Sequence, residues 1–305
     1  MKKNINKTES LDEQCIICGS WSNLIISAKI REKNHNVLKC EDCGFVFLSN
    51  YEELDYSNNY KSLVFIEGMS REEQIIMRSG TLQRFNQIVS ELCLVRTKNV
   101  KILEIGAGGG ASIYSLRELI PNLKIDCVEL NDHDRDYINK TFDVCSYRSV
   151  DDLNKKYDII FGHHVFEHFV DPVHMLNKLA SVSTANTQIY FSFPNFNDYY
   201  NATLNNKERR KYLEFNYHLA HPYYYTKETF TKLVNKSSWE IESFNTIQDY
   251  SIVNYFNWYI NGKRSKNIED GTIVNYNIGE LNKSFIELVE KTGFGNNISV
   301  ILKKR

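Results

Sequence analysis

A run of apolar residues that ends in closely spaced glycines most constrains how this chain can fold. Residues 100–110 read VKILEIGAGGG, and a helical pattern follows from Ser112 to Leu119. A strand that passes through Gly-x-Gly into a helix is how the first strand of an open α/β sheet meets its first helix. Glycine suits this place because it lets the backbone approach a ligand closely. The sequence therefore predicts an α/β fold with a nucleotide-binding turn here.

Two classes of cofactor use such a turn. Gly106, Gly108 and Ala111 satisfy the dinucleotide fingerprint Gly-x-Gly-x-x-Gly/Ala, and Glu129 ends the next apolar run, where an acidic side chain can bind ribose hydroxyls. The glycines alone therefore do not exclude a dehydrogenase, which tight NAD binding would reveal.

An acidic residue before the glycines and a second motif favour another class. Glu104, Gly106, Gly108 and Gly110 form acidic-x-Gly-x-Gly-x-Gly, and residues 157–172 read YDIIFGHHVFEHFVDP. On these motifs the chain resembles the class I S-adenosylmethionine-dependent methyltransferases, which carry the same glycine pattern and a Leu-Glu-His-x-x-Asp-Pro segment after the fourth strand. The resemblance implies S-adenosylmethionine (SAM) as cofactor.

The apolar runs predict a seven-stranded Rossmann-like methyltransferase sheet with helices on both faces. Helices are expected within 71–94, after Asp171 as N-cap with Pro172 in the first turn, and after Thr226. Polar, tyrosine-rich segments at about 195–225 and 249–295 do not fit the alternation of strands and helices in the core, and we predict that they are acceptor-side insertions. The expected strands are 100–105, 124–130, 144–147, 157–163, 188–193, 239–247 and 298–302.

Four of the seven cysteines form two Cys-x-x-Cys pairs, each followed by glycine. The pairs are Cys15 with Cys18 and Cys40 with Cys43, the spacing of a zinc ribbon. Four thiolates leave no open coordination position, so we predict a structural Zn²⁺ ion, with reduced, metal-free thiols as the alternative. The predicted domains are the ribbon at 1–50, a connector with helices at 51–98 that contains Tyr51, Tyr56 and Tyr60, and the methyltransferase core at 99–305.

The resemblance also implies the roles of residues around the cofactor. Ligands of open α/β sheets lie beyond the carboxyl ends of the strands. There the glycines would lie under the methionine part of SAM, Glu104 would contact its ammonium group, and Glu129 would accept hydrogen bonds from both ribose hydroxyls. His163 and His164 end the fourth strand, and the family places such residues against the cofactor. Asp151 or Asp152 would either meet the adenine amino group or cap a helix.

Methylation of a hydroxyl requires that its proton leave, and histidine titrates in the right range to take it. His168 belongs to the Glu167–His168 pair that matches the family's Glu-His element, and His221 matches a histidine on the acceptor side of similar enzymes. His168, His221 and Glu167 are therefore the candidate catalytic residues. The alternatives are a capping role for His168 and a structural loop role for His221, which has His218 near it in the sequence.

Residues 248–258 indicate the kind of acceptor. They read QDYSIVNYFNW, with Gly262-Lys263 after them, and resemble a segment of methyltransferases from surface-polysaccharide (capsule or lipopolysaccharide) clusters. Aromatic rings interleaved with amides suit a carbohydrate, and Lys263 and Arg264 suit a phosphate. We expect O-methylation of a sugar or nucleotide-linked precursor. C-methylation of a nucleotide-linked keto-sugar is the close rival, although those enzymes usually have a longer chain.

Charge and hydropathy limit the partners. The chain has 37 basic and 38 acidic side chains, and its basic residues form only short clusters such as 207–211. This balance argues against a nucleic-acid substrate, so an RNA methyltransferase is the weaker alternative. Residues 1–14 lack a signal-peptide pattern and no long apolar run occurs, which predicts a cytoplasmic protein without membrane insertion. We expect a small-molecule acceptor, and a homodimer is left open.

Overall fold

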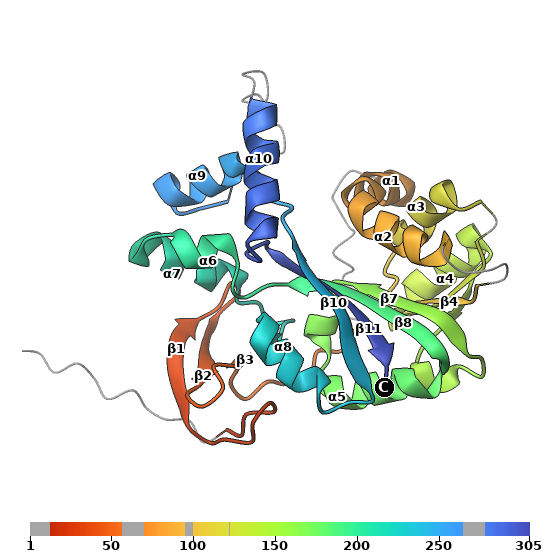
Figure 1. Ribbon diagram of the computed structural model, residues 1–305, viewed down its shortest axis with the longest axis horizontal. Coiled ribbons are helices and arrows are strands. Elements are labelled where there is room, and N and C mark those ends of the chain that lie inside the picture. The colour runs from red at the N-terminus through yellow and green to blue at the C-terminus, as the bar shows by residue number, and fades with distance from the viewer. Residues whose placement is uncertain (1–12, 57–69, 95–99, 122, 265–277) are drawn as a thin grey trace, which may run out of the picture. The chain divides into compact units, whose positions relative to one another are not determined.

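The computed structural model describes residues 13–56, 70–94, 100–121, 123–264 and 278–305, and its chain forms two compact units (Figure 1). Tyr60 of the predicted connector lies outside the described residues, as does the segment 265–277 of the second predicted insertion. Unit 1 consists of Met1–Glu52, Phe193–Leu233 and Phe244–Ser299, and unit 2 consists of Glu53–Ser192, Val234–Ser243 and Val300–Arg305.

A seven-stranded sheet is the main element of unit 2, and its strand order is β10-β11-β8-β7-β4-β5-β6. The pairs β4–β5, β5–β6, β4–β7 and β7–β8 are parallel. The last residues of β8 and β10 and the first of β11 belong to unit 1. The strands are β4 (Ile102–Ile105), β5 (Ile125–Val128), β6 (Cys145–Tyr147), β7 (Tyr157–His163), β8 (Ser183–Pro194), β10 (Trp239–Ile247) and β11 (Asn297–Lys304).

The order of the strands reverses at β4. The chain first adds β5 and β6 on one side of β4 and then returns to add β7 and β8 on the other side. In open α/β sheets this reversal creates a crevice beyond the carboxyl ends of the strands. The predicted α/β class and all seven strands are confirmed, with small shifts in their ends.

Helices cover both faces of this sheet in Figure 1, with α1, α2 and α3 on one face and α5 on the other. The first face encloses a core to which Phe85, Ile113, Ile138 and Phe161 contribute. Asp171 caps α5 by accepting a hydrogen bond from the His174 amide at 2.9 Å, as the sequence predicts. The helices are α1 (Arg71–Thr81), α2 (Gln83–Leu94), α3 (Ala111–Leu119), α4 (Asp132–Phe142) and α5 (Pro172–Ser181), with short 3-10 helices η1 (Val150–Asp152) and η2 (Phe166–His168).

Unit 1 contains a four-stranded sheet in the order β1-β2-β3-β9. Three of its strands come from the predicted ribbon, whereas the fourth comes from the first predicted insertion, because Val46 pairs with Tyr224 and Phe47 with Tyr223. Residues far apart in the sequence thus complete one sheet. The strands are β1 (Asn23–Lys29), β2 (Asn34–Cys40), β3 (Val46–Leu48) and β9 (Tyr223–Tyr224).

The two predicted insertions form helices in unit 1, which their polar composition did not predict. Their tyrosines and Trp258 explain why these helices fold, since Tyr200, Tyr212 and Trp258 are buried together in one aromatic cluster. None of the helices formed by the described residues is long and apolar enough to cross a membrane. The helices of the insertions are α6 (Tyr199–Thr203), α7 (Asn206–Asn216), α9 (Ile252–Asn261) and α10 (Ile278–Lys291), and α8 (Lys227–Val234) between them is the helix predicted after Thr226.

Candidate cofactor and catalytic site

Three left-handed glycines shape the turn between β4 and α3. Gly106, Gly108 and Gly110 have φ angles of 72°, 54° and 87°, which side chains rarely allow. A Cβ atom on Gly106 would lie 2.7 Å from Val165, and one on Gly110 would lie 2.6 Å from Phe142. A Cβ atom on Gly108 would meet no atom within 4 Å. Packing thus requires glycine at the two outer positions, whereas Gly108 borders open space where a ligand can lie.

Glu129 follows β5 and turns its carboxylate toward this glycine turn. One oxygen accepts a hydrogen bond from the Gly108 amide at 2.6 Å, and the other accepts one from the Asn131 amide at 2.9 Å. Burial raises the pKa of Glu129, while these backbone hydrogen bonds act in the opposite direction. The predicted ribose-binding residue and the predicted turn are therefore brought together.

Glu104 lies in β4 between β5 and β7 and is almost fully buried, with 2% of its surface exposed. Burial raises the pKa of Glu104 to about 8, a hydrogen bond with Ser112 lowers it, and the charge of Glu129 raises it. The atom Oε2 is buried without a hydrogen-bond partner. A buried, incompletely paired carboxylate is costly unless a cation or donor meets it.

These observations fit a cationic cofactor such as SAM. The charge of the partly buried Glu129 raises the pKa of the buried Glu104, and a positively charged ligand would offset this effect. The open space beside Gly108 and the unpaired oxygen of Glu104 both lie where β4 leads into the glycine turn. The residues present therefore suit a ligand that carries an ammonium group and a sulfonium group.

His163 and His164 occupy the end of β7, but their environments differ. The His163 ring packs against Phe85 of α2 with a centroid distance of 4.6 Å, and burial lowers its pKa well below the usual value. His163 is therefore neutral near pH 7. The side chain of His164 is 41% exposed, and its Nδ1 atom lies 3.0 Å from Oε1 of Glu167.

The sequence-adjacent pair Glu167 and His168 lies in η2, and each has a contact elsewhere in unit 2. Glu167 is 2% exposed and hydrogen-bonds to His164. The hydroxyl of Tyr56 lies 3.1 Å from Nδ1 of the His168 ring. Tyr56, expected only as a residue of the connector, thus contacts a candidate catalytic residue.

Asp151 and Asp152 form part of the capped 3-10 helix η1. The Asp152 carboxylate accepts a hydrogen bond from the Ser149 amide, and the Asp151 carboxylate forms an ion pair with Lys178 of α5. The bond with Lys178 lowers the pKa of Asp151. The capping alternative accounts for Asp152, and Asp151 has a partner on a neighbouring helix.

His221 and His218 lie in unit 1, just before β9. The His221 amide donates a hydrogen bond to the His218 carbonyl at 2.9 Å, and the two rings are 5.0 Å apart. His218 accepts from the Ala220 amide through Nδ1 and contacts Glu32 through Nε2 at 3.1 Å. Both ring nitrogens of His218 therefore hold this loop in place.

The four predicted zinc ligands converge in unit 1. Cys15 and Cys43 have sulfur atoms 3.5 Å apart, those of Cys18 and Cys40 are 3.4 Å apart, and all four lie within 4.8 Å of one another. Gly19 and Gly44 adopt φ angles of 78° and 77°, the left-handed bends that knuckles of this kind need. Four thiol groups at these distances suit tetrahedral Zn²⁺.

Some residues of the segment 248–258 pack inside unit 1 and are not available to a ligand. Gln248 donates to the Tyr250 carbonyl and accepts from the Asn296 amide, and Trp258 is 3% exposed among aromatic rings. Phe256 and Tyr259 are each 49% exposed on α9. Of the aromatic residues expected to meet a carbohydrate, Phe256 is exposed, Tyr250 and Tyr255 are partly exposed and Trp258 is buried; Tyr259 directly follows the predicted stretch.

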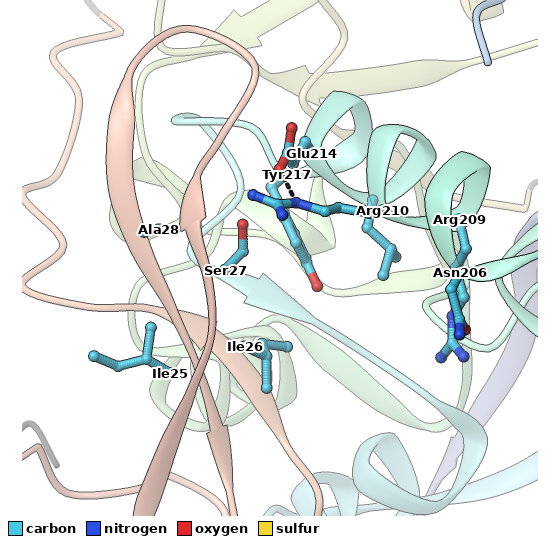
Figure 2. Close-up of a pocket in the computed structure, with 10 residues that line it drawn as sticks. Ile25, Ile26, Ser27, Ala28, Asn206, Arg209, Arg210, Glu214 and Tyr217 are labelled. Carbon is cyan, nitrogen blue, oxygen red and sulfur yellow. Dashed lines mark hydrogen bonds and ion pairs between the residues drawn. The ribbon is translucent and has the colours of Figure 1, made fainter. Parts of the chain in front are cut away.

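Unit 1 also contains a pocket of about 500 Å³ between β1 and α7 (Figure 2). Arg210 forms an ion pair with Glu214 through Nε at 2.8 Å, and Nε of Arg209 donates to Asn201 at 2.8 Å. An aliphatic wall beside guanidinium groups suits a phosphorylated organic molecule. The lining residues are Ile25, Ile26, Ser27, Ala28, Asn206, Arg209, Arg210, Leu213, Glu214 and Tyr217.

Ser112 and Val165 are site residues that the sequence argument did not identify. Ser112 hydrogen-bonds to Glu104, and Val165 packs on the glycine turn. A glycine within a strand often marks a close approach, and Gly162 in β7 was such a signal. A Cβ atom on Gly162 would lie 2.5 Å from Val165.

Comparison with known proteins agrees with this geometry. A family model described as a methyltransferase domain matches residues 77–243, more than half of the chain. The chain belongs to this family and is a SAM-dependent methyltransferase. A search of curated proteins finds no matching relative.

Several solved structures are similar to this chain. The plantazolicin methyltransferase BpumL in complex with SAH is 19% identical, with 77% of this chain and 88% of that chain covered and a TM-score of 0.45. Geranyl diphosphate methyltransferase in complex with SAM is 10% identical, with 84% and 99% covered and a TM-score of 0.48. The mitomycin 7-O-methyltransferase MmcR is 10% identical, with 78% and 59% covered and a TM-score of 0.45.

Alanine at Gly108 should separate cofactor binding from folding. A left-handed alanine costs about 1–2 kcal/mol of unfolding free energy, but it meets no protein atom within 4 Å. We expect a folded protein whose affinity for S-adenosylhomocysteine (SAH), measured by calorimetry, falls about ten-fold or more because the methyl group takes up ligand space.

Gly110→Ala is the matched control for this experiment. It carries the same backbone strain and a clash with Phe142, so urea unfolding should show a further loss of about 1–3 kcal/mol. Unchanged SAH affinity in Gly108→Ala would show that the ligand does not lie beside this residue.

Proposed function

We propose that this methyltransferase transfers the methyl group of SAM to a hydroxyl group of a sugar or nucleotide-linked precursor of a surface polysaccharide. The observation that carries the cofactor site is Glu104, whose buried carboxylate has an unpaired oxygen beside an open glycine turn. Glu104 binds the ammonium group of the methionine part, and Gly106, Gly108 and Gly110 lie along it. Glu129 binds the ribose hydroxyls.

When bound, SAM supplies a methyl group on a positively charged sulfur that becomes neutral on transfer, so positioning of the acceptor provides much of the rate. In this proposal the residues of the chain bind and orient the two reactants. His163 and His164 lie at the end of β7, next to the cofactor turn. His168 and His221 are candidates for acceptor contact, and Tyr56 orients the His168 ring through its hydroxyl.

Two features of unit 1 support a sugar or nucleotide-linked acceptor. Phe256 and Tyr259 expose aromatic surface on α9, and Lys263 and Arg264 follow that helix with positive charge. Aromatic faces bind the C–H groups of sugars, and basic groups bind phosphate. The pocket between β1 and α7 adds aliphatic and guanidinium groups suited to a phosphorylated molecule. The cytoplasmic location and the homodimer stay predictions.

C-methylation of a nucleotide-linked keto-sugar is the second candidate, since enzymes of that class also carry a zinc ribbon. We expect that the protein, incubated with isotope-labelled SAM and a panel of nucleotide-linked sugars, adds one labelled methyl group to a sugar. Mass spectrometry detects the product and NMR locates the methyl group. A methyl group on carbon would establish the second candidate, and transfer to RNA but to no sugar would contradict both.

Ionisation of Glu104 should control cofactor affinity. Its pKa of about 8 means that the carboxyl group is mostly protonated below that pH in the free protein. An ammonium group favours the ionised form, so binding releases a proton, and affinity should rise as the pH increases toward 8. Calorimetry with SAH should show binding on the order of ten-fold tighter for each pH unit between about 6 and 7.

Glu104→Gln should remove this pH dependence, because the amide does not titrate. Glu129→Ala should weaken SAH binding by about ten-fold through loss of the ribose contacts. A pH dependence should remain but move to lower pH, because the charge of Glu129 raises the pKa of Glu104. A pH-independent affinity in the wild-type protein would contradict the ammonium contact of Glu104.

We propose that Cys15, Cys18, Cys40 and Cys43 bind one structural zinc ion. Elemental analysis of the purified protein should find about one zinc per chain. Chelation should lower the melting temperature, because the four thiols lie in turns that the metal would hold together. Cys93→Ser, which alters a cysteine of the unit 2 core, is the control and should retain the zinc. A metal-free protein with an unchanged melting temperature would rule out the ion.

A further inference from the structure

His164 and Glu167 form a hydrogen-bonded pair just beyond β7. The Nδ1 atom of His164 lies 3.0 Å from Oε1 of Glu167. When Glu167 is ionised it can only accept hydrogen bonds, so Nδ1 of His164 is then the donor and Nε2 keeps its lone pair. Glu167 is 2% exposed, whereas the side chain of His164 is 41% exposed. A buried acid thus orients a histidine that solvent or a substrate can reach.

The backbone of His164 is held in an unusual conformation. Its φ angle is 50°, a left-handed value that is uncommon for residues other than glycine, although histidine, like asparagine and aspartate, adopts it more often than most. The His164 amide donates a hydrogen bond to the Ser192 carbonyl of β8 at 2.8 Å. Strain of this kind persists where the surrounding structure enforces it, and it is often found at functional sites. In this conformation the His164 ring packs edge-to-face against the ring of His163.

The position of His164 links it to the cofactor turn. The next residue, Val165, packs on Gly106, which belongs to the turn beside Glu104. His164 therefore lies beyond the carboxyl ends of two adjacent strands, β4 and β7, where ligands of such sheets bind. The neighbouring ring of His163, 4.3 Å away, is kept neutral by burial and adds no positive charge near pH 7.

We propose that His164 is the general base of the methyl transfer and that Glu167 is the positioning residue that fixes its Nδ1–H tautomer. This inference rests on the proposed function and gives the base role to His164 rather than to His168 or His221. The O–H bond of the acceptor breaks and its proton passes to Nε2 of His164. The electron pair left on oxygen forms the bond to the methyl carbon, and the pair of the broken methyl–sulfur bond stays on sulfur.

The tautomer of His164 can be measured without any methyl transfer. Nitrogen-15 NMR of the full-length protein should show His164 with a protonated Nδ1 and an unprotonated Nε2, and His164→Asn identifies the signal by its loss. Glu167→Gln should give a mixture of tautomers, because the amide can donate as well as accept. An Nε2–H tautomer in the wild-type protein would overturn the pairing.

Chemical rescue tests the base itself. His164→Gly suits the left-handed backbone and removes the ring, so the protein should fold, and kcat should fall about 100-fold or more. Added imidazole should restore part of the turnover, which a merely structural role would not allow. The KM for SAM should change little. His168→Gly is the matched variant, whose turnover imidazole should not restore.

Two outcomes would refute the assignment. Undiminished kcat in His164→Gly would exclude the base role, and a raised KM for SAM with unchanged kcat would make His164 a cofactor contact only. If the wild-type protein methylates no sugar, the proposed acceptor fails, but the NMR measurement still decides whether Glu167 fixes the tautomer. An error in the proposed acceptor can therefore be distinguished from an error in the proposed pairing of His164 with Glu167.

Discussion

The contact between Val165 and the backbone of Gly106 fixes how closely the ends of β4 and β7 approach, and the candidate site depends on it. A side chain at Gly106 or at Gly162 would collide with Val165, so two glycines and one β-branched residue determine this spacing. The contact places His164 beside the glycine turn, and the His164 amide donates a hydrogen bond to the Ser192 carbonyl of β8. Packing between strands thus positions groups that carry the chemistry.

Buried acids dominate the electrostatics of this end of the sheet. Loss of hydration raises the pKa of both Glu104 and Glu129; the charge of Glu129 adds to the effect at Glu104, and the charge of Asp134 adds to it at Glu129. Hydrogen bonds from two backbone amides offset part of the hydration that Glu129 loses, whereas one oxygen of Glu104 has no hydrogen-bond partner. Such an arrangement is poorly satisfied in the free protein and suits a positively charged ligand. The site is therefore organised for a cation before any cofactor binds.

Unit 1 shows how aromatic residues can serve stability and recognition in one segment. Trp258 packs in the core of α6, α7 and α9, while Phe256 and Tyr259 of the same helix stay half exposed. The sequence pattern could not separate these roles, because helical packing sends residues one and two positions apart in different directions. The β3–β9 pairing likewise joins the ribbon to a segment nearly two hundred residues later.

The sequence by itself determined the seven strands, the glycine turn, the Asp171 cap and the two cysteine knuckles, because each depends on local patterns or on residue types with few alternatives. It also proposed Glu104 as a candidate from the glycine motif and Glu129 from its place at the end of a strand. Only the tertiary structure decided that Glu167 pairs with His164, that Tyr56 contacts His168 and that Trp258 is buried. Side-chain partners depend on how separate segments pack and on which rotamers fit, and neither is encoded in the spacing of residues along the chain.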